Sequence, residues 1–259
     1  MVGEGAGMKQ LAIDDSLDGS EQAGYGIPGV RSVGSCRSSL FAPPDFSLQM
    51  LRATLAPGTE LVLSPRPGDE VLHVVSGSIS TGDGLCPTGG VLLLDEGVAR
   101  NLQAESETVL LHFGRQGVGR GAAGAGSGLV RMVGPAGAYA TFDSERDTRF
   151  YADSDEEFSA TFFSTGRTGP YRSLPHSHSQ DEIIYVAAGS LTLGSRQVPV
   201  GSAIAIPADR KYGFRGDDGG FVLLNYRPGP SYFSGSDGTP PFLEGGRATG
   251  MARVDTPDH

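Results

Sequence analysis

The chain has 259 residues and a formal net charge of −10, which argues against nucleic acid or an anionic membrane as a partner, because both attract clustered cations. Forty glycines, seventeen prolines and no tryptophan, without a long stretch of helical periodicity, predict short strands joined by tight turns. Two cysteines, Cys36 and Cys86, are too few for a disulfide framework. With no signal-peptide pattern and no apolar run long enough to span a bilayer, we expect a soluble, cytoplasmic protein.

Residues 1–44 are rich in glycine, serine and acidic side chains and offer little to bury. Eight apolar segments farther along the chain are predicted strands, and glycine or proline brackets most of them. In chain order they are residues 49–55, 71–75, 91–94, 108–113, 159–163, 183–186, 203–206 and 221–226.

Residues 114–128, between the fourth and fifth of these strands, are nearly all glycine, alanine, arginine and serine, a composition typical of a flexible linker. The linker contains Gly119, Gly121 and Gly124 at the spacing of a dinucleotide-binding fingerprint. That fingerprint needs a helix at its third glycine, and residues 125–128 are a poor helix start. We therefore expect no nucleotide cofactor.

The two halves of the chain repeat one another at an offset close to 112 residues. Residues 70–77 align with 182–189, Gly90 with Gly201, and 109–113 with 222–226. A repeat of this length is a whole domain rather than a solenoid unit, so the sequence predicts two tandem domains of similar fold.

Residues 169–189 place two imidazoles and one carboxylate at metal-ligand spacing. Side chains two apart on an extended strand share a face, so His176 and His178 can point at one atom. Glu182 follows a polar turn and opens an apolar run. Because three ligands on one side of an ion leave its other positions open, the pattern predicts a working metal site rather than a structural one.

This segment resembles the first motif of the cupins. Residues 201–212 resemble the second cupin motif, with Gly201 and Pro207 at the family's spacing. Together with the repeat, the resemblance is to the bicupins and covers most of residues 45–228. It implies an all-β fold of two tandem cupin jelly-roll barrels. The family's fourth ligand, a histidine, falls at Tyr212, and this departure favours a three-ligand site.

The resemblance also suggests the domain boundaries. We expect an N-terminal arm at residues 1–44 that orders only against a neighbour or the partner barrel. A degenerate first barrel follows at 45–114, then the linker at 115–135, a metal-binding second barrel at 136–230 and a C-terminal tail at 231–259.

The first copy of the motif is eroded. Ser64 and Arg66 stand at the positions that match His176 and His178, and Asn101 stands opposite Tyr212. Glu70 remains, but one carboxylate cannot hold a transition metal tightly. We therefore expect the first barrel to be structural.

Three further side chains are candidates for the pocket of the second barrel. If the strand runs unbroken through Pro175, Arg172 shares the face of the histidines and can clamp a substrate carboxylate or enolate; the alternative is an outward-facing arginine. Tyr212 is a hydrogen-bond donor to a bound oxygen, a weak ligand or a space-filling ring. Asn225 faces the pocket or pairs with the backbone, and we favour the second.

Two histidines and a carboxylate with open positions are typical of non-haem Fe(II) oxygenases, although Mn, Ni, Co and Zn suit the same atoms. We therefore predict an oxygenase, of the dioxygenase type, that acts on a small polar enol-type or hydroxylated aromatic or heteroaromatic metabolite. One alternative is a non-redox isomerase, cyclase, lyase or aminohydrolase that uses the metal as a Lewis acid. Another is a metal-free or sensory binding bicupin. A homodimer is compatible with any of these.

Overall fold

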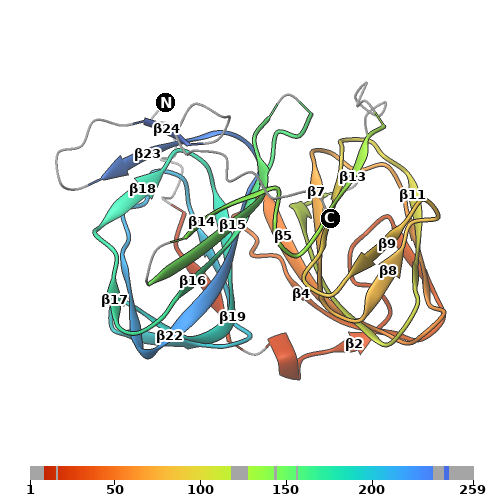
Figure 1. Cartoon of the computed structure of the whole chain (residues 1–259), viewed down its shortest axis with the longest axis horizontal. Coiled ribbons are helices and arrows are strands. Elements are labelled where there is room, and N and C mark those ends of the chain that lie inside the picture. The colour runs from red at the N-terminus through yellow and green to blue at the C-terminus, as the bar shows by residue number, and fades with distance from the viewer. Residues whose placement is uncertain are drawn as a thin grey trace, which may run out of the picture.

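The structure is a computed structural model that describes residues 9–15, 17–117, 128–142, 145–155, 157–235 and 242–244. Strands dominate this part of the chain, and a short 3₁₀ turn, η1 (Leu17–Gly19), is the one helical element in it. None of the described helical structure is long and apolar enough to cross a membrane. Two barrels lie side by side (Figure 1).

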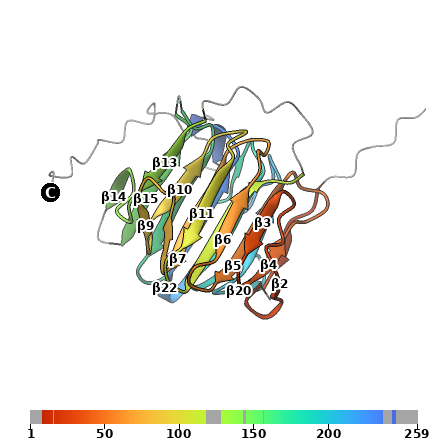
Figure 2. The ribbon, with the colours of Figure 1, turned by 90° about the vertical axis from the view of Figure 1, so that its right-hand side faces the viewer.

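The first barrel consists of a seven-stranded and a five-stranded sheet, which are seen from the outside in Figure 2. The seven-stranded sheet has the order β13-β10-β7-β12-β5-β4-β2, and the five-stranded sheet has the order β3-β6-β11-β8-β9. The strands are β2 (Gln22–Ala23), β3 (Val30–Val33), β4 (Cys36–Phe41), β5 (Leu48–Leu55), β6 (Glu60–Leu63), β7 (Glu70–Ser76), β8 (Ser78–Ser80), β9 (Leu85–Pro87), β10 (Val91–Leu94), β11 (Arg100–Ala104), β12 (Thr108–Arg115) and β13 (Val130–Val133).

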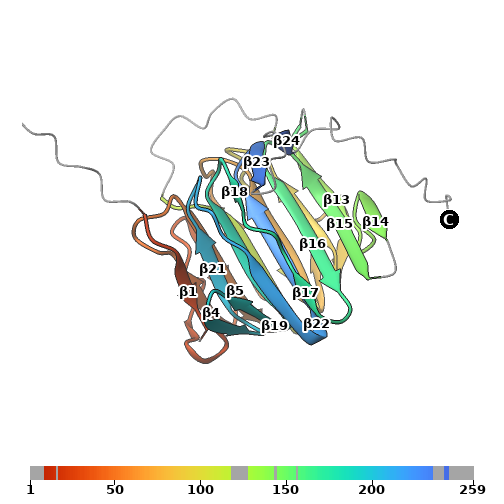
Figure 3. The same cartoon turned by 90° about the vertical axis from the view of Figure 1, so that its left-hand side faces the viewer.

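The second barrel has a nine-stranded sheet and a three-stranded sheet at one end (Figure 3). The larger sheet follows β1-β21-β19-β22-β16-β15-β14, with β17 on β22 and β20 on β19; the smaller is β18-β23-β24. The strands are β1 (Ala12–Asp14), β14 (Tyr139–Phe142), β15 (Arg146–Asp153), β16 (Thr161–Arg167), β17 (Tyr171–Arg172), β18 (His176–His178), β19 (Glu182–Leu193), β20 (Arg196–Pro199), β21 (Ala203–Ile206), β22 (Phe214–Arg227), β23 (Ser231–Gly235) and β24 (Phe242–Glu244).

The apolar runs of the sequence form strands that are buried on both faces. On β7, Leu72 and Val74 belong to the core inside the first barrel, whereas Val71 belongs to a core shared by the two barrels. On β19, Ile184 faces the interior of the second barrel and Ile183 faces the shared core. Because successive side chains point to opposite faces, a strand between two cores is apolar at nearly every position.

All eight segments predicted as strands coincide with or overlap observed strands, and the all-β prediction is confirmed. The repeat has a structural basis as well. Gly77 and Gly189 occupy equivalent positions, with φ of 80° and 68°. A Cβ on Gly77 would lie 2.3 Å from the backbone oxygen of Glu107, and one on Gly189 would lie 2.2 Å from that of Gly220. Glycine is therefore required at both positions for the same backbone conformation and close approach.

Strand pairing extends beyond the limits expected for each barrel. β3 and β4, which lie within residues 1–44, pair with β6 and β5, and β13, within 115–135, pairs with β10. β1 pairs with β21 of the second barrel (Figure 3). The chain thus contributes strands from both flanking segments to the sheets, while the domain boundaries themselves remain a prediction. Residues 118–127, which hold the glycine-rich motif, lie outside the described residues.

Candidate functional site

The two predicted histidine ligands lie on β18, at one end of the second barrel. β18 is a short strand, and β23 holds it from one side in antiparallel register, with His178 opposite Phe233. From the other side, the backbone of His176 exchanges two hydrogen bonds of 2.9 Å with Tyr212. The histidine backbone is therefore held between the second predicted motif and β23.

The ring of His176 has a defined orientation. Its Nδ1 lies 2.8 Å from the carbonyl oxygen of Leu174. A carbonyl oxygen can only accept, so in the neutral imidazole Nδ1 carries the proton and Nε2 carries the lone pair. This is the second-shell contact by which metal-binding histidines are usually oriented.

An aromatic side chain that sequence reasoning missed lies against both histidines. The ring of Phe233 on β23 stacks on His176 at 5.2 Å between centroids with an interplanar angle of 19°, and its centroid is 5.6 Å from that of His178. Tyr212 approaches His176 at 4.5 Å. Phe233 falls in the segment predicted as a tail. Because the pairing of β23 with β18 joins residues more than 50 positions apart, no local sequence pattern predicts the contact between Phe233 and the histidines.

Glu182, the third predicted ligand, is the first residue of β19 and is 1% exposed. Its Oε2 accepts a hydrogen bond of 2.7 Å from Asn225 Nδ2 and lies 3.6 Å from Arg227 Nε. Its Oε1 is buried without a hydrogen-bond partner. A buried carboxylate oxygen in this state is costly unless another group, such as a cation, satisfies it.

These donors fit a transition metal in their chemistry. The two imidazole rings lie 5.2 Å apart between centroids, and Glu182 offers a desolvated oxygen. Among the residues that the structure describes, however, no three histidine, cysteine, aspartate or glutamate side chains converge closely enough to hold an ion. The ligand set therefore stays a prediction.

The structure decides one open question and overturns one expectation about neighbouring residues. Arg172 takes the outward-facing alternative: it is exposed, and it is Tyr171 that packs against the core of the second barrel, because the extended chain is interrupted before His176 and forms two strands, β17 and β18. Asn225 does not pair with the backbone as we favoured. Its side chain is buried and donates to Glu182, so it belongs to the site.

In the first barrel, protein side chains occupy the position that matches the predicted metal site of the second barrel. Glu70 is buried, and its Oε1 lies 2.5 Å from Arg66 Nε and 3.0 Å from His112 Nε2. The guanidinium of Arg66 also donates to the carbonyl oxygens of Pro28 and Arg115. The other ring nitrogen of His112 is hydrogen-bonded to the hydroxyl of Tyr25 at 2.9 Å. Sequence analysis identified Arg66 and Glu70 but not His112 or Tyr25.

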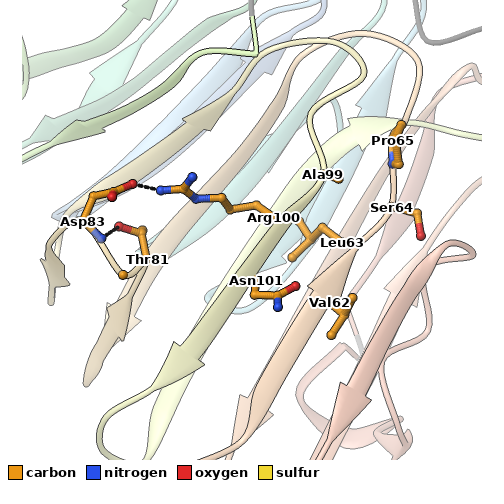
Figure 4. Close-up of a pocket in the computed structure, with 10 residues that line it drawn as sticks. Val62, Leu63, Ser64, Pro65, Thr81, Asp83, Ala99, Arg100 and Asn101 are labelled. Atoms are coloured by element: carbon orange, nitrogen blue, oxygen red, sulfur yellow. Dashed lines mark hydrogen bonds and ion pairs between the residues drawn. The ribbon is translucent and has the colours of Figure 1, made fainter.

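Two surface depressions differ in their relation to the site. One, of about 550 Å³, is lined by Lys9, Asp181 and residues 207–211, which are chain neighbours of Glu182 and Tyr212. The other, of about 610 Å³, lies on the five-stranded sheet of the first barrel (Figure 4). There Arg100 is paired with Asp83, and no histidine is among the lining residues. Of these two depressions, the first is the one lined by chain neighbours of the predicted site residues.

No protein-family model matches the sequence, and none of the curated proteins matches it. Solved structures do match. Ylba of E. coli is 19% identical, with 84% of this chain and 90% of that chain covered and a TM-score of 0.58. A candidate dioxygenase of Nostoc punctiforme is 12% identical, with coverage of 84% and 82% and a TM-score of 0.62. Oxalate decarboxylase of Bacillus subtilis is 12% identical, with coverage of 82% and 76% and a TM-score of 0.58.

A seed globulin of pumpkin and the coconut allergen cocosin share the arrangement as well. The matches thus include proteins named as enzymes, a protein named as a seed globulin and a protein named as an allergen. At these identities the likeness establishes a common fold, and one fold hosts many unrelated activities.

Proposed function

We propose that this chain, a bicupin by fold, is a metal-dependent enzyme whose second barrel holds Fe(II) through His176, His178 and Glu182. We further propose that it is an oxygenase of the dioxygenase type, acting on a small polar enol-type or hydroxylated aromatic or heteroaromatic metabolite. The observation that carries the proposal is a buried carboxylate with one unsatisfied oxygen, Glu182, four residues beyond two imidazoles on β18 that lie 5.2 Å apart between centroids.

Bound iron would supply the electron transfer that lets dioxygen react with an enol or catechol-like substrate. A dioxygenation places both oxygen atoms in the product and needs no external reductant. The protein's part is to bind, orient and exclude water. The contact between His176 Nδ1 and Leu174 directs Nε2 as the donor atom, and the rings of Phe233 and Tyr212 supply apolar walls beside it.

Tyr212 is the side chain that we assign to the reacting atoms. It is 9% exposed and lies at the position of the family's fourth ligand. A phenol held beside His176 donates a hydrogen bond to a substrate oxygen on which negative charge develops. The depression beside Asp181 and residues 207–211 is within the size range of small-molecule sites and is the approach we assign to the substrate.

Elemental analysis tests the metal. We expect one divalent ion per chain in the wild type and none in His176→Ala. His112→Asn is the matched control, because it changes the buried histidine of the first barrel to the residue at the equivalent position of the second. Two ions per chain, or unchanged content in His176→Ala, would refute the assignment of the ligands.

Oxygen consumption tests the reaction class. With iron loaded and candidate enols or catechol-like compounds supplied, we expect turnover to require dioxygen and to stop when zinc replaces iron. Full turnover without dioxygen, or equal rates with zinc, would support the isomerase, lyase or aminohydrolase alternative, in which the metal acts as a Lewis acid.

A further inference from the structure

Each barrel contains one buried arginine beside the glutamate that begins its long central strand. In the first barrel Arg66 lies 2.5 Å from Glu70, and in the second Arg227 lies 3.6 Å from Glu182. Both arginines are 3% exposed. The two arginines nevertheless approach their carboxylates from different sides, because Arg66 and Arg227 are not at equivalent positions in the two barrels.

The strand register establishes which positions are equivalent. Leu72 of β7 is opposite His112 of β12, and Ile184 of β19 is opposite Asn225 of β22. We call β12 and β22 the closing strands. Two residues farther along, Gly114 stands on β12 and Arg227 on β22.

The same comparison holds on the other side of each glutamate. Four residues before Glu70 stands Arg66, and four residues before Glu182 stands His178. The arginine thus stands before the glutamate in the first barrel and on the partner strand in the second. The opposite position holds Gly114 in the first barrel and His178 in the second.

The exchange has opposite effects on the two carboxylates. In the first barrel the guanidinium takes the side where a metal ligand would stand and bonds to Glu70 Oε1 and to two backbone carbonyls. A Cβ on Gly114 would lie 3.4 Å from the same oxygen, so a side chain at this position would stand directly beside the carboxylate. The cation that satisfies this glutamate is part of the protein.

In the second barrel the arginine acts from the closing strand through an amide. Arg227 Nε donates to Asn225 Oδ1 at 3.2 Å, and Asn225 Nδ2 donates to Glu182 Oε2 at 2.7 Å. Because a guanidinium only donates, the amide oxygen must face Arg227 and the amide nitrogen must face the carboxylate. Oε2 is thus held on the side of β22, and Oε1 remains buried without a hydrogen-bond partner.

We propose that Arg227 is a positioning residue that, through Asn225, orients Glu182 for metal binding, and that Arg66 closes the equivalent site of the first barrel by standing in for the metal. The proposal rests on the metal site proposed above. It explains why one barrel is able to take a cation and the other is not, although both contain the glutamate.

The affinity of the full chain for Co²⁺, followed by its visible spectrum, tests the role of Arg227. Arg227→Met removes the donor at similar volume, and we expect the affinity to fall by roughly 10- to 100-fold, the usual effect of losing an outer-shell partner. Arg227→Lys, which keeps a charged donor, is expected to recover part of the loss. Arg167→Met, which changes another arginine of the same barrel, serves as the control. If Arg227→Met does not fold, the comparison of Arg227→Lys with wild type carries the test.

The reciprocal experiment uses the first barrel, in a chain that also carries His176→Ala and His178→Ala. There, Arg66→His places an imidazole beside Glu70 and His112, and we expect it to create a Co²⁺ site that the same chain with Arg66 intact lacks. Folded Arg66→His protein without cobalt would overturn the role of Arg66. Wild-type protein that binds no metal would remove the proposed function and this inference together, whereas unchanged affinity in folded Arg227→Met would overturn the inference alone.

Discussion

At the scale of single residues, two equivalent positions on β12 and β22 distinguish the barrels. His112 and Asn225 occupy equivalent positions and both contact the buried glutamate of their own barrel. The imidazole of His112 is in turn bonded to Tyr25, so the interior of the first barrel is occupied by a chain of protein groups. In the second barrel the corresponding region contains the histidines of β18 and the rings of Tyr212 and Phe233.

Tyr212→Phe tests whether the hydroxyl acts on the substrate or on the metal. The ring packs 4.5 Å from His176, so removal of the oxygen alone should leave packing and metal content intact. We expect turnover to slow by about 10- to 1000-fold, the cost of losing a hydrogen bond to a developing charge. We also expect no phenolate charge-transfer band in the oxidised, iron-loaded wild type. A coloured wild type that bleaches and loses iron on this substitution would make Tyr212 a ligand.

His73 predicts a pH-dependent stability. Its ring contacts Tyr151 and Phe162 between the barrels, and burial lowers its pKa from 6.5 to about 4. Between pH 6.5 and 4, His73 therefore binds a proton in the unfolded chain but not in the folded state. Its contribution to the free energy of unfolding is complete above pH 6.5 and is lost as the pH falls toward 4. At about 1.4 kcal/mol per pKa unit the loss reaches up to roughly 3 kcal/mol.

His73→Phe separates this contribution from that of the carboxylates. The variant keeps a ring in the aromatic cluster but cannot titrate, so its free energy of unfolding in urea should decrease less than that of the wild type between pH 6.5 and 4. Parallel pH profiles for the two proteins would contradict the assignment.

At the scale of elements, β1 is the most informative strand because it is the first in the chain yet lies in the second barrel. Ala12–Asp14 pairs with β21, and Leu11 and Ile13 pack against the core inside that barrel. β21 lies between β1 and β19, and β19 carries Glu182 at its start. The strand therefore covers what would otherwise be an unpaired edge next to the predicted site.

Removal of residues 1–15 should destabilise the second barrel more than the first. Loss of β1 exposes the backbone edge of β21 and apolar surface at Leu11 and Ile13, which together contribute several kcal/mol. Thermal unfolding and limited proteolysis measure the effect, and cleavage should begin within residues of the second barrel. Arg196→Ala is the control, since it removes the exposed ion pair with Asp15 but leaves β1 paired. Equal unfolding temperatures for the truncated and full chains would contradict this role.

At the scale of the whole molecule, a shared core and one buried carboxylate join the barrels. Aromatic rings from both halves meet in this core, among them Phe113 with Phe162 and Tyr226. Beside them Asp69, which is 5% exposed, accepts hydrogen bonds from the backbone nitrogens of Ser159 and Ala160, and its carbonyl oxygen accepts one from Tyr226.

Asp69→Ala should weaken the connection between the barrels. It removes the acceptor of the buried Ala160 N–H and of the part-buried Ser159 N–H, and each hydrogen bond to a charged group contributes about 1.5–3 kcal/mol, so we expect a loss of roughly 3 kcal/mol. Calorimetry should show one unfolding transition in the wild type and two in the variant. Asp147→Ala, which removes a partly exposed carboxylate paired with Arg149, should cost less than about 1 kcal/mol. A single transition at the wild-type temperature would refute the role of Asp69.

The sequence by itself determined the all-β fold, its repetition and most of its strands, because apolar runs bracketed by glycine or proline, the repeated glycines Gly77 and Gly189, and the motif around His176 are local patterns. It also indicated that the first copy of the site is altered, since Ser64 and Arg66 can be read directly from the alignment of the halves.

Only the tertiary structure decided which groups meet from distant parts of the chain. The pairing of β1 with β21, the stacking of Phe233 on His176, and the line from Arg227 through Asn225 to Glu182 all join strands far apart in sequence, and no local propensity encodes such contacts. The orientation of Arg172, which the sequence left open, was decided by the tertiary structure for the same reason. Parity predicts a face only while a strand is unbroken, and the break at Pro175 depends on how β17 and β18 pair with β22 and β23.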